Sequence, residues 1–179
     1  MPTYVGFLRA VNLGARRKFP KDDLRACAEA AGFTDVETYL NTGNLRVRTP
    51  RRSLPRVEEA LEAAFAADRG FEVPTILFGQ AELTELSEYA VELGERLGPL
   101  QRHYVTLLRE EPSAEARAAV EAVSTDLTRV EVHGRSVNVT WVEAVRGDVD
   151  PLGAALSRQL GLGTARTARV LAEVTRRWC

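Results

Sequence analysis

A short motif occurs twice in the chain, one hundred residues apart, and constrains the fold more than any other feature. Residues 4–9 read Tyr-Val-Gly-Phe-Leu-Arg, and residues 104–109 read Tyr-Val-Thr-Leu-Leu-Arg. The segments after each copy also follow the same order of strand and helix patterns. A repeated order of elements is the signature of a duplicated unit. The sequence therefore predicts two related lobes.

The first lobe reads as strand, helix, strand, strand, helix, strand. Strand patterns cover residues 4–11, 36–40, 45–49 and 73–78, and two helices with one apolar face occupy the intervals at 20–31 and 53–69. This β-α-β-β-α-β order is that of a ferredoxin-like unit. The predicted fold is α+β, a tandem duplication of a ferredoxin-like unit in which each copy is followed by an extra helix.

The second lobe repeats the order over residues 103–166, with a hairpin around Gly134 and a short fourth strand near Thr164. Between the lobes lies an acidic helix, over residues 80–95. Gly98 and Pro99 follow this helix and mark the best boundary. The predicted domains are residues 1–98, which include the acidic helix, and residues 99–179, which include the terminal helix.

Composition favours a cytoplasmic protein that does not interact with membranes. No apolar run approaches the roughly 20 residues that span a bilayer, and the chain opens with a strand pattern instead of an export leader. The two cysteines form neither a disulfide framework nor a metal-ligand spacing. Phosphate-loop, dinucleotide and metalloprotease motifs are absent, so we expect no metal and no cofactor. We expect structural roles for His103 and His133, and solvated positions for the glutamates on outward helix faces.

Charge is unevenly distributed along the chain. Residues 1–52 carry ten Lys or Arg and five Asp or Glu, whereas residues 53–101 carry three and ten. The total of −1 argues against wholesale polyanion binding, but the basic segment can still form a local patch.

The loop after the first strand concentrates groups that bind anions. It leads into a helix N-terminus, where unpaired N–H groups and the helix dipole favour negative charge. Arginine binds two oxygens at once, and glycine permits close approach of the backbone. A solvated basic loop, with Asn12 and Gly14 only forming a turn, explains the same residues. The candidate ligand-binding residues here are Arg9, Asn12, Gly14, Arg16, Arg17 and Lys18.

The hairpin segment 38–44 supplies two further candidates, Tyr39 and Asn44, although a tight turn also accounts for its composition. Gly43 is expected at positive φ. We expect the first and third strands to run parallel, which places this turn and the first loop at opposite ends of the lobe. One ligand then touches both only if the other lobe, or a second copy in a homodimer, brings them together.

A spaced pattern of residues runs through the first lobe. It consists of Arg9, Asn12, Gly14, Leu24-Arg25, Gly32-Phe33, Val36, Thr38-Tyr39 and Thr42-Gly43-Asn44. This pattern resembles the bacterial domain-of-unknown-function family 1697. The family's C-terminal pattern is usually Thr-x-Arg-Asn-Trp; this chain keeps Thr164 and Arg166 but has Thr167 and Ala168 in the last two places. The resemblance adds Arg166 to the candidate ligand-binding residues and implies a tandem of ferredoxin-like units, but it implies no activity.

Three functional hypotheses remain open. The first is a binding protein that holds a phosphorylated or carboxylate ligand, or a nucleic-acid backbone, at the loop after the first strand. The second is a small enzyme with a site between lobes or subunits. The third is an interaction module whose acidic helix meets a basic partner. Sequence-specific RNA binding is disfavoured because the third strand, residues 45–49, carries no aromatic residue for base stacking.

Overall fold

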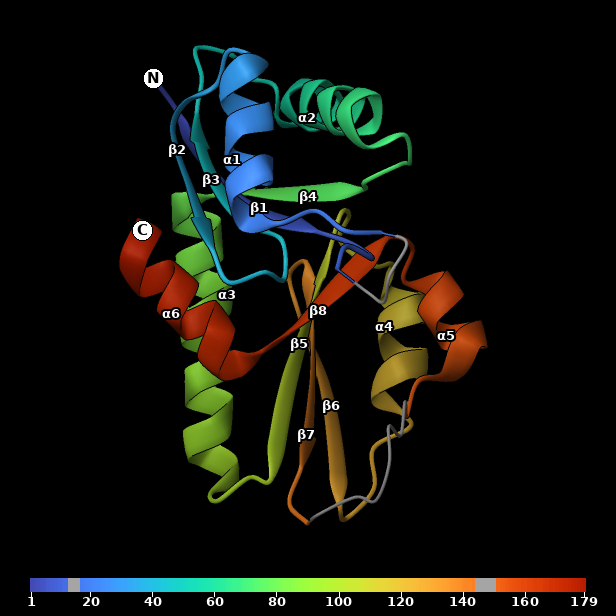
Figure 1. The fold of residues 1–179 in the computed structure, drawn as a ribbon. Helices are drawn as coiled ribbons and strands as arrows, with labels where there is room; N and C mark the ends of the chain where they lie inside the picture. Colours follow the sequence, from blue (N-terminus) through green and yellow to red (C-terminus); the bar gives the residue numbers. More distant parts are fainter. Residues whose placement is uncertain (13–16, 144–150) are drawn as a thin grey trace. The chain divides into compact units, whose positions relative to one another are not determined.

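A computed structural model describes residues 1–12, 17–143 and 151–179 of the 179-residue chain. This described part contains six helices and eight strands, and the strands form two four-stranded antiparallel sheets (Figure 1). The chain divides into unit 1, Met1–Leu83 with Arg176–Cys179, and unit 2, Thr84–Thr175. The predicted class, a mixed α and β protein with two similar lobes, is confirmed.

Unit 1 contains one sheet covered on one face by two helices. Its elements are β1 (Thr3–Leu8), α1 (Lys21–Ala30), β2 (Thr34–Tyr39), β3 (Asn44–Arg48), α2 (Leu54–Arg69) and β4 (Thr75–Gly79). The strand order is β2-β3-β1-β4, and every neighbouring pair is antiparallel.

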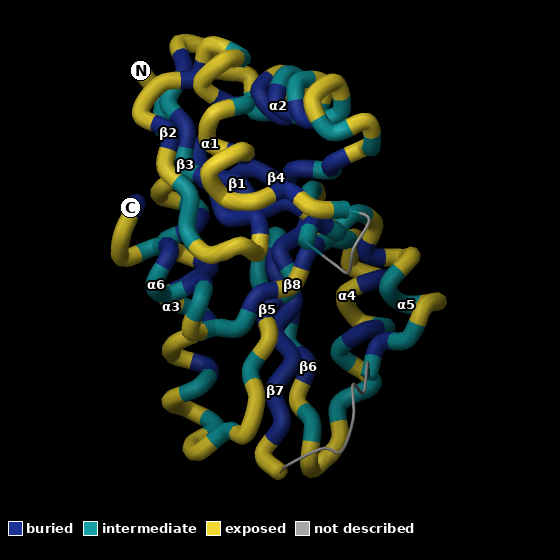
Figure 2. The backbone as a smooth tube through the Cα atoms, in the orientation of Figure 1, coloured by how far each residue is buried: buried dark blue, intermediate teal, exposed yellow. Residues whose placement is uncertain are grey.

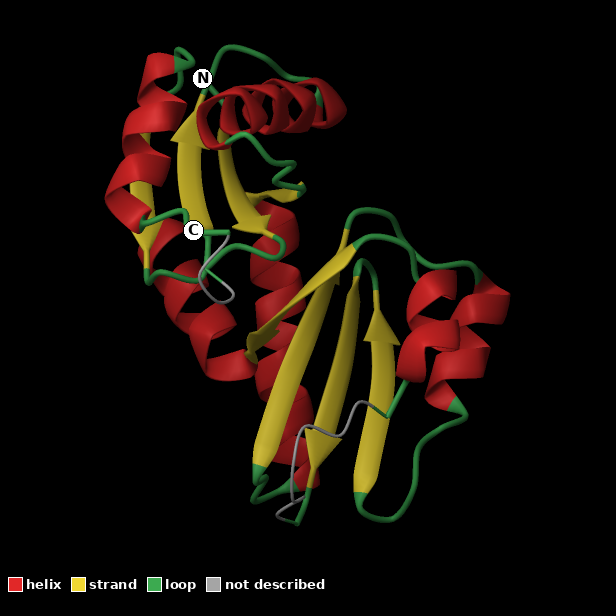
Figure 3. Ribbon diagram, turned by 45° about the vertical axis from the view of Figure 1, so that its right-hand side comes forward, coloured by secondary structure: helices red, strands yellow, loops and turns green. Residues whose placement is uncertain are grey.

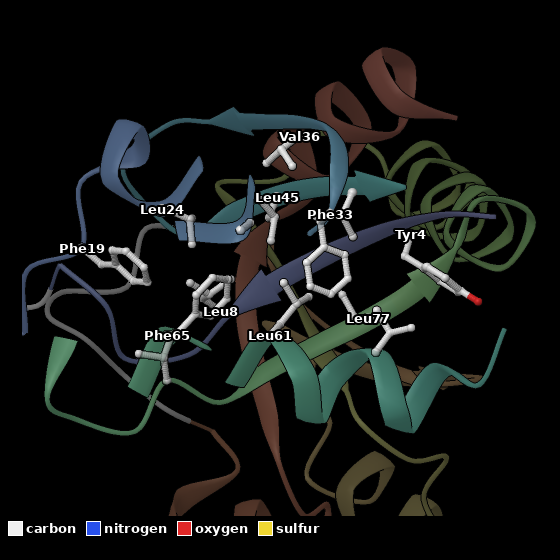
Figure 4. Packing of buried hydrophobic residues seen from close by; sticks show 14 of the residues in the cluster. Tyr4, Leu8, Phe19, Leu24, Phe33, Val36, Leu45, Leu61, Phe65 and Leu77 are labelled. Atoms are coloured by element: carbon white, nitrogen blue, oxygen red, sulfur yellow. The ribbon is translucent and has the colours of Figure 1, made fainter. Parts of the chain in front are cut away.

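The core of unit 1 lies between this sheet and α1 and α2. Residues of β1 alternate between the faces, so Tyr4 and Leu8 join the cluster under the helices. Figure 4 shows Phe19 and Phe65 in the same cluster, and their rings meet edge to face at 5.2 Å. Because Leu8 and Phe19 are both buried, the loop between them is anchored at each end.

Unit 2 has the corresponding arrangement, and α4 and α5 cover one face of its sheet (Figure 3). The strand order is β6-β7-β5-β8, again with antiparallel pairs, and β7 is buried along its whole length (Figure 2). Helices α3 and α6 each contain residues of both units. The elements are α3 (Gln80–Leu97), β5 (Arg102–Leu108), α4 (Ala114–Glu121), β6 (Thr128–His133), β7 (Ser136–Trp141), α5 (Gly153–Gln159), β8 (Gly163–Thr167) and α6 (Ala168–Trp178).

The repeated motif occupies equivalent places in the two sheets. The N–H groups of Leu8 and Arg9 donate to carbonyls beside β3 and β4, at 2.8 Å each. Those of Leu108 and Arg109 donate to the matching carbonyls beside β7 and β8, at 2.8 and 2.9 Å. The prediction that Arg9 and Arg109 are equivalent is confirmed.

Strand β1 runs antiparallel to β3, with Phe7 opposite Asn44. The prediction that these strands run parallel was wrong. The α1 crossover makes β1 and β2 share a direction, and the hairpin then reverses β3 between them. The loop after β1 and the turn before β3 therefore lie at the same end of the sheet.

Two glutamates of α2 close the outer edge of β4. The carboxylate of Glu58 accepts the N–H of Leu77, and that of Glu62 accepts the N–H of Thr75, at 2.8 Å each. Glu58 is buried, so the expectation that the helix glutamates are solvated was wrong here. These two bonds occupy edge N–H groups that a foreign strand would otherwise pair with.

Across the described residues, we find no helix with both the length and the apolar character that a membrane crossing requires.

Candidate functional site

Asn12 closes the loop that follows β1. Its backbone has a φ of 57°, and its N–H donates to the carbonyl of Arg17 at 2.7 Å. Its side-chain Oδ1 accepts the N–H of Phe19 at 2.8 Å, while Nδ2 donates to the carbonyls of Phe19 and Asn41 at 2.8 and 2.7 Å. The side chain thus holds together the loop, the approach to α1 and the hairpin turn.

The hairpin turn also binds the first N–H of α1. Asn41 Oδ1 accepts the N–H of Lys21 at 3.0 Å. Together with the bond from Phe19 to Asn12, this occupies two of the N–H groups that were predicted to bind an anion. At these two positions side-chain oxygens of the protein accept the N–H groups. An anion bound here would therefore have to contact side chains instead.

The cationic side chains of the loop have different surroundings. Arg17 donates to the carbonyl of Glu72 and lies over the ring of Phe71 at 5.0 Å, so it is held against the protein. Arg9 and Lys18 are exposed, and neither forms an ion pair with any residue the structure describes. The predicted ligand residues Gly14 and Arg16 lie outside the described residues.

The acidic residues nearest in sequence are already paired. Asp22 and Asp23 belong to the first turn of α1, and their carboxylates contact Arg25 at 3.4 Å and Arg69 at 3.2 Å. Lys21, which precedes them, is exposed and has no ion pair within the described part of the chain. Lys21 therefore joins Arg9 and Lys18 as an uncompensated cation.

Tyr39 and Asn44 brace the hairpin. Asn44 is fully buried, and its Nδ2 donates to the carbonyl of Tyr39 at 2.8 Å and to Oγ1 of Thr42 at 2.9 Å. The ring of Tyr39 is half-buried, with the guanidinium of Arg177 4.6 Å from its centre. Asn44 thus acts through the shape of the turn, and Tyr39 lies beside the C-terminal residues of unit 1.

Arg166 lies in unit 2, on β8 opposite Val105. Its Nη1 donates to Oγ1 of Thr164 at 3.0 Å and to the carbonyl of Ala165 at 2.8 Å. Burial lowers the pKa of its guanidinium to about 10, so it stays charged at neutral pH. Arg166 is buried and is held by bonds within β8 of unit 2.

The arginines on β3 are engaged within the sheet. Arg46 contacts the carboxylate of Glu37 at 2.7 Å, and Arg48 contacts that of Asp35 at 2.7 Å. These guanidinium groups are partly neutralised, which disfavours the sheet surface as a binding face for a nucleic-acid backbone.

The two histidines and Cys27 have internal partners. His103 Nε2 lies 2.9 Å from Oδ1 of Asn138, and His133 stacks on Tyr89 with ring centres 4.1 Å apart. Burial raises the pKa of the Cys27 thiol, which disfavours the reactive thiolate. No group of three metal-binding side chains occurs among the described residues.

Sequence reasoning missed two residues of this site, Lys21 and Asn41. Lys21 is the first residue of α1, and it follows Lys18, the last of the predicted ligand-binding residues in the loop, by three positions. Asn41 lies in the hairpin turn, and the assumed parallel strands separated it from the loop. A prediction that β3 runs antiparallel to β1 would have placed Asn12 and Asn41 at the same end of the sheet.

The fold and these contacts define a two-unit α+β protein in which Asn12 and Lys21, on either side of a basic loop, are bonded to Asn41 of the hairpin turn. The model of a family described as protein of unknown function, DUF1697, matches residues 1–137. The chain belongs to this family. A conserved bacterial protein from Streptococcus pneumoniae has a similar structure, with a TM-score of 0.73, 18% sequence identity and coverage of 99% of each chain. At this identity the similarity concerns the fold alone. A comparison with curated proteins found no match.

Proposed function

We propose that the protein binds a small phosphate- or carboxylate-bearing ligand at the loop after β1. The observation that carries the proposal is that three cations beside this loop, Arg9, Lys18 and Lys21, are exposed. None of them has an ion pair among the described residues, while the adjacent Asp22 and Asp23 are paired elsewhere. An anion would supply the missing negative charge.

Hydrogen bonds hold the described residues on either side of the loop in place. Asn12 fixes its two ends through bonds to Arg17 and Phe19, and the bond to Asn41 ties it to the hairpin. A preorganised site loses less side-chain and loop entropy on binding than a mobile one. In this proposal Asn12 and Asn44 position the loop and the turn, and Gly14 and Arg16 remain predicted contributors.

The proposal is tested by calorimetric titration with inorganic phosphate, with a panel of phosphorylated and dicarboxylate metabolites, and with a single-stranded oligonucleotide. Replacement of Arg9 by Gln is expected to weaken binding by roughly 1.5–3 kcal/mol, the range for hydrogen bonds to charged groups. Raising the ionic strength should weaken it further, because a surface site is screened over about 8–10 Å.

Arg56 provides the matched control, since it is exposed on α2 and has no ion pair among the described residues. Arg56→Gln removes the same charge from the same unit and should leave binding unchanged. Equal losses in the two variants would show that only net charge matters. Tighter binding of the oligonucleotide than of every small anion would replace the small-ligand proposal by a nucleic-acid one.

The architecture supports a second, evolutionary proposal: the two units are duplicated ferredoxin-like units. In support, both sheets have corresponding strand orders, and the motif ending in Arg9 or Arg109 has the same register in each. The domain boundary between residues 98 and 99 stays a prediction.

A further inference from the structure

A groove lies beside β6, one of the two edge strands of the sheet in unit 2. It consists of two hollows, of about 440 and 410 Å³, which share the lining residues Arg96, Arg129 and Glu131. We call it the β6 groove. It involves none of the residues proposed above to bind an anion in unit 1. Its chemistry divides into a charged part and an apolar part.

The charged part contains two arginines that share one carboxylate. Glu131 Oε2 accepts from Arg96 at 2.5 Å and from the Tyr89 hydroxyl at 2.7 Å, and Oε1 accepts from Arg129 Nε at 3.0 Å. Burial alone would raise the pKa of Glu131, but the hydrogen bonds from Tyr89 and the two arginines outweigh it and lower the pKa. Glu131 is therefore ionised at neutral pH.

The guanidinium groups remain accessible. The side chains of Arg96 and Arg129 are 58% and 56% exposed, against 15% for Glu131. Each guanidinium carries five N–H donors, and the bonds to Glu131 use only a few. Two such groups side by side can bind the oxygens of a phosphate or carboxylate. The other carboxylates of the groove are Glu121, which contacts Arg117 at 3.5 Å, and Asp126.

The apolar part lies in the first hollow. Leu97, Leu127 and Val142 line it together with the two arginines. Leu127 and Val142 are exposed to 48% and 37%, and a hydrogen bond of 3.1 Å from the Val142 N–H to the Leu127 carbonyl holds their backbones together. A ligand that covers these apolar side chains removes them from water, and this burial contributes favourable free energy to binding.

The backbone of β6 is closed to a partner strand. Ser124 Oγ is bonded to both the N–H and the carbonyl of Val130, at 3.0 and 3.3 Å. Glu121 accepts the N–H of Val132 at 2.8 Å, and Arg117 donates to its carbonyl. Because these edge groups are satisfied, the groove is not built for an added β-strand. Recognition there must use side chains.

We propose that the β6 groove binds a small amphipathic anion, namely a phosphate or carboxylate attached to an apolar group. The acidic group contacts Arg96 and Arg129, and the apolar group covers Leu97, Leu127 and Val142. This ligand class matches both parts of the groove, whereas a bare inorganic anion uses only one.

Calorimetric titration of the full chain with phenyl phosphate, phenylacetate, inorganic phosphate and phenol tests the proposal. Phenyl phosphate is expected to bind about tenfold more tightly than inorganic phosphate, since covering one ring edge buries apolar area. Phenol, which lacks the anion, should show no saturable binding. The affinity for phenylacetate, compared with that for phenyl phosphate, shows whether the groove prefers a carboxylate or a phosphate.

Variants assign the binding to this groove. The double change Arg96→Gln and Arg129→Gln should weaken phenyl phosphate at least tenfold, and Leu127→Ser should weaken phenyl phosphate while sparing inorganic phosphate. Asp126→Asn should strengthen binding, because it removes a negative charge from the first hollow. Arg158 is exposed on α5 without an ion pair among the described residues, so Arg158→Gln serves as the control and should have no effect.

Two results would overturn the proposal: equal affinities for phenyl phosphate and inorganic phosphate, or unchanged phenyl phosphate binding in both the double arginine variant and Leu127→Ser. The Leu127 and Asp126 changes are at exposed positions, so they leave the fold intact even if the arginine variant is destabilised. Binding that is lost in Arg9→Gln but kept in the double variant would assign the ligand to unit 1 instead.

Discussion

Replacement of Gly43 by alanine is expected to destabilise unit 1 by about 2–5 kcal/mol, through backbone strain and steric overlap together. Gly43 has a φ of 74°, as the sequence predicted, in the turn that meets the loop after β1. A Cβ at this position would lie 2.7 Å from Leu8 Cβ and 2.8 Å from Val11 Cγ2. Leu8 Cβ is attached to a strand paired on both sides, so it cannot easily withdraw.

The two contributions have separate magnitudes. A residue with a Cβ pays about 1–2 kcal/mol in the left-handed region, and an extra methyl group in a packed site costs about 1–3 kcal/mol. Gly70, also in unit 1, has a φ of 73° and no atom within 4 Å of a built Cβ. Gly70→Ala therefore isolates the backbone contribution and should cost only about 1–2 kcal/mol.

Urea unfolding followed by circular dichroism gives both free energies, provided that the m-values of the variants equal that of the wild type. Gly43→Ala is expected to be less stable than Gly70→Ala by about 1–3 kcal/mol. A difference below about 0.5 kcal/mol, within the usual effect of a surface substitution, would refute the close packing of the turn on β1.

Three further predictions concern the loop, a histidine and a strand edge. Asn12→Ala should lower the unfolding free energy by about 1–3 kcal/mol, because it leaves backbone groups of the loop unbonded; Asn12→Gly, which relieves the positive φ, should recover part of this loss. Burial lowers the pKa of His103, and the hydrogen bond with Asn138 only partly offsets this shift. The unfolded state then binds more protons than the folded state, so stability falls as the pH drops through 6.5, the ordinary pKa of histidine, and His103→Gln should flatten that fall in urea unfolding. The double change Glu58→Ala and Glu62→Ala should expose N–H groups of β4 and promote self-association, seen in sedimentation velocity; a monodisperse variant would contradict the edge-closing role.

The repeated unit could be predicted from the sequence because strand patterns are local. The motif ending in Arg9 and Arg109 fixed the start of each lobe, and the order of apolar patterns fixed the elements that followed. The direction of β3 follows from the crossover through α1 and the hairpin around Gly43. Both features are predicted from the sequence, but the parallel assignment did not combine them and placed the loop and the turn at opposite ends of the sheet.

The roles of several polar residues could not be predicted, because these roles depend on contacts between elements. Glu58 and Glu62 are four residues apart, so they lie on the same side of α2. The pattern of the helix taken by itself places that side toward solvent. Only the neighbouring β4 edge explains why Glu58 is buried. In the same way, the residue type of Asn12 suggested a ligand donor or a turn, while the structure shows all its side-chain bonds directed to the backbone.

The most direct measurement of the central proposal is an NMR titration of ¹⁵N-labelled protein with sodium phosphate at constant ionic strength. Binding at the loop after β1 predicts saturable amide shifts concentrated at Arg9, Asn12, Lys18 and Lys21, and their loss in Arg9→Gln but not in Arg56→Gln. Shifts that rise linearly without saturation, or that persist unchanged in Arg9→Gln, would contradict an anion site at this loop.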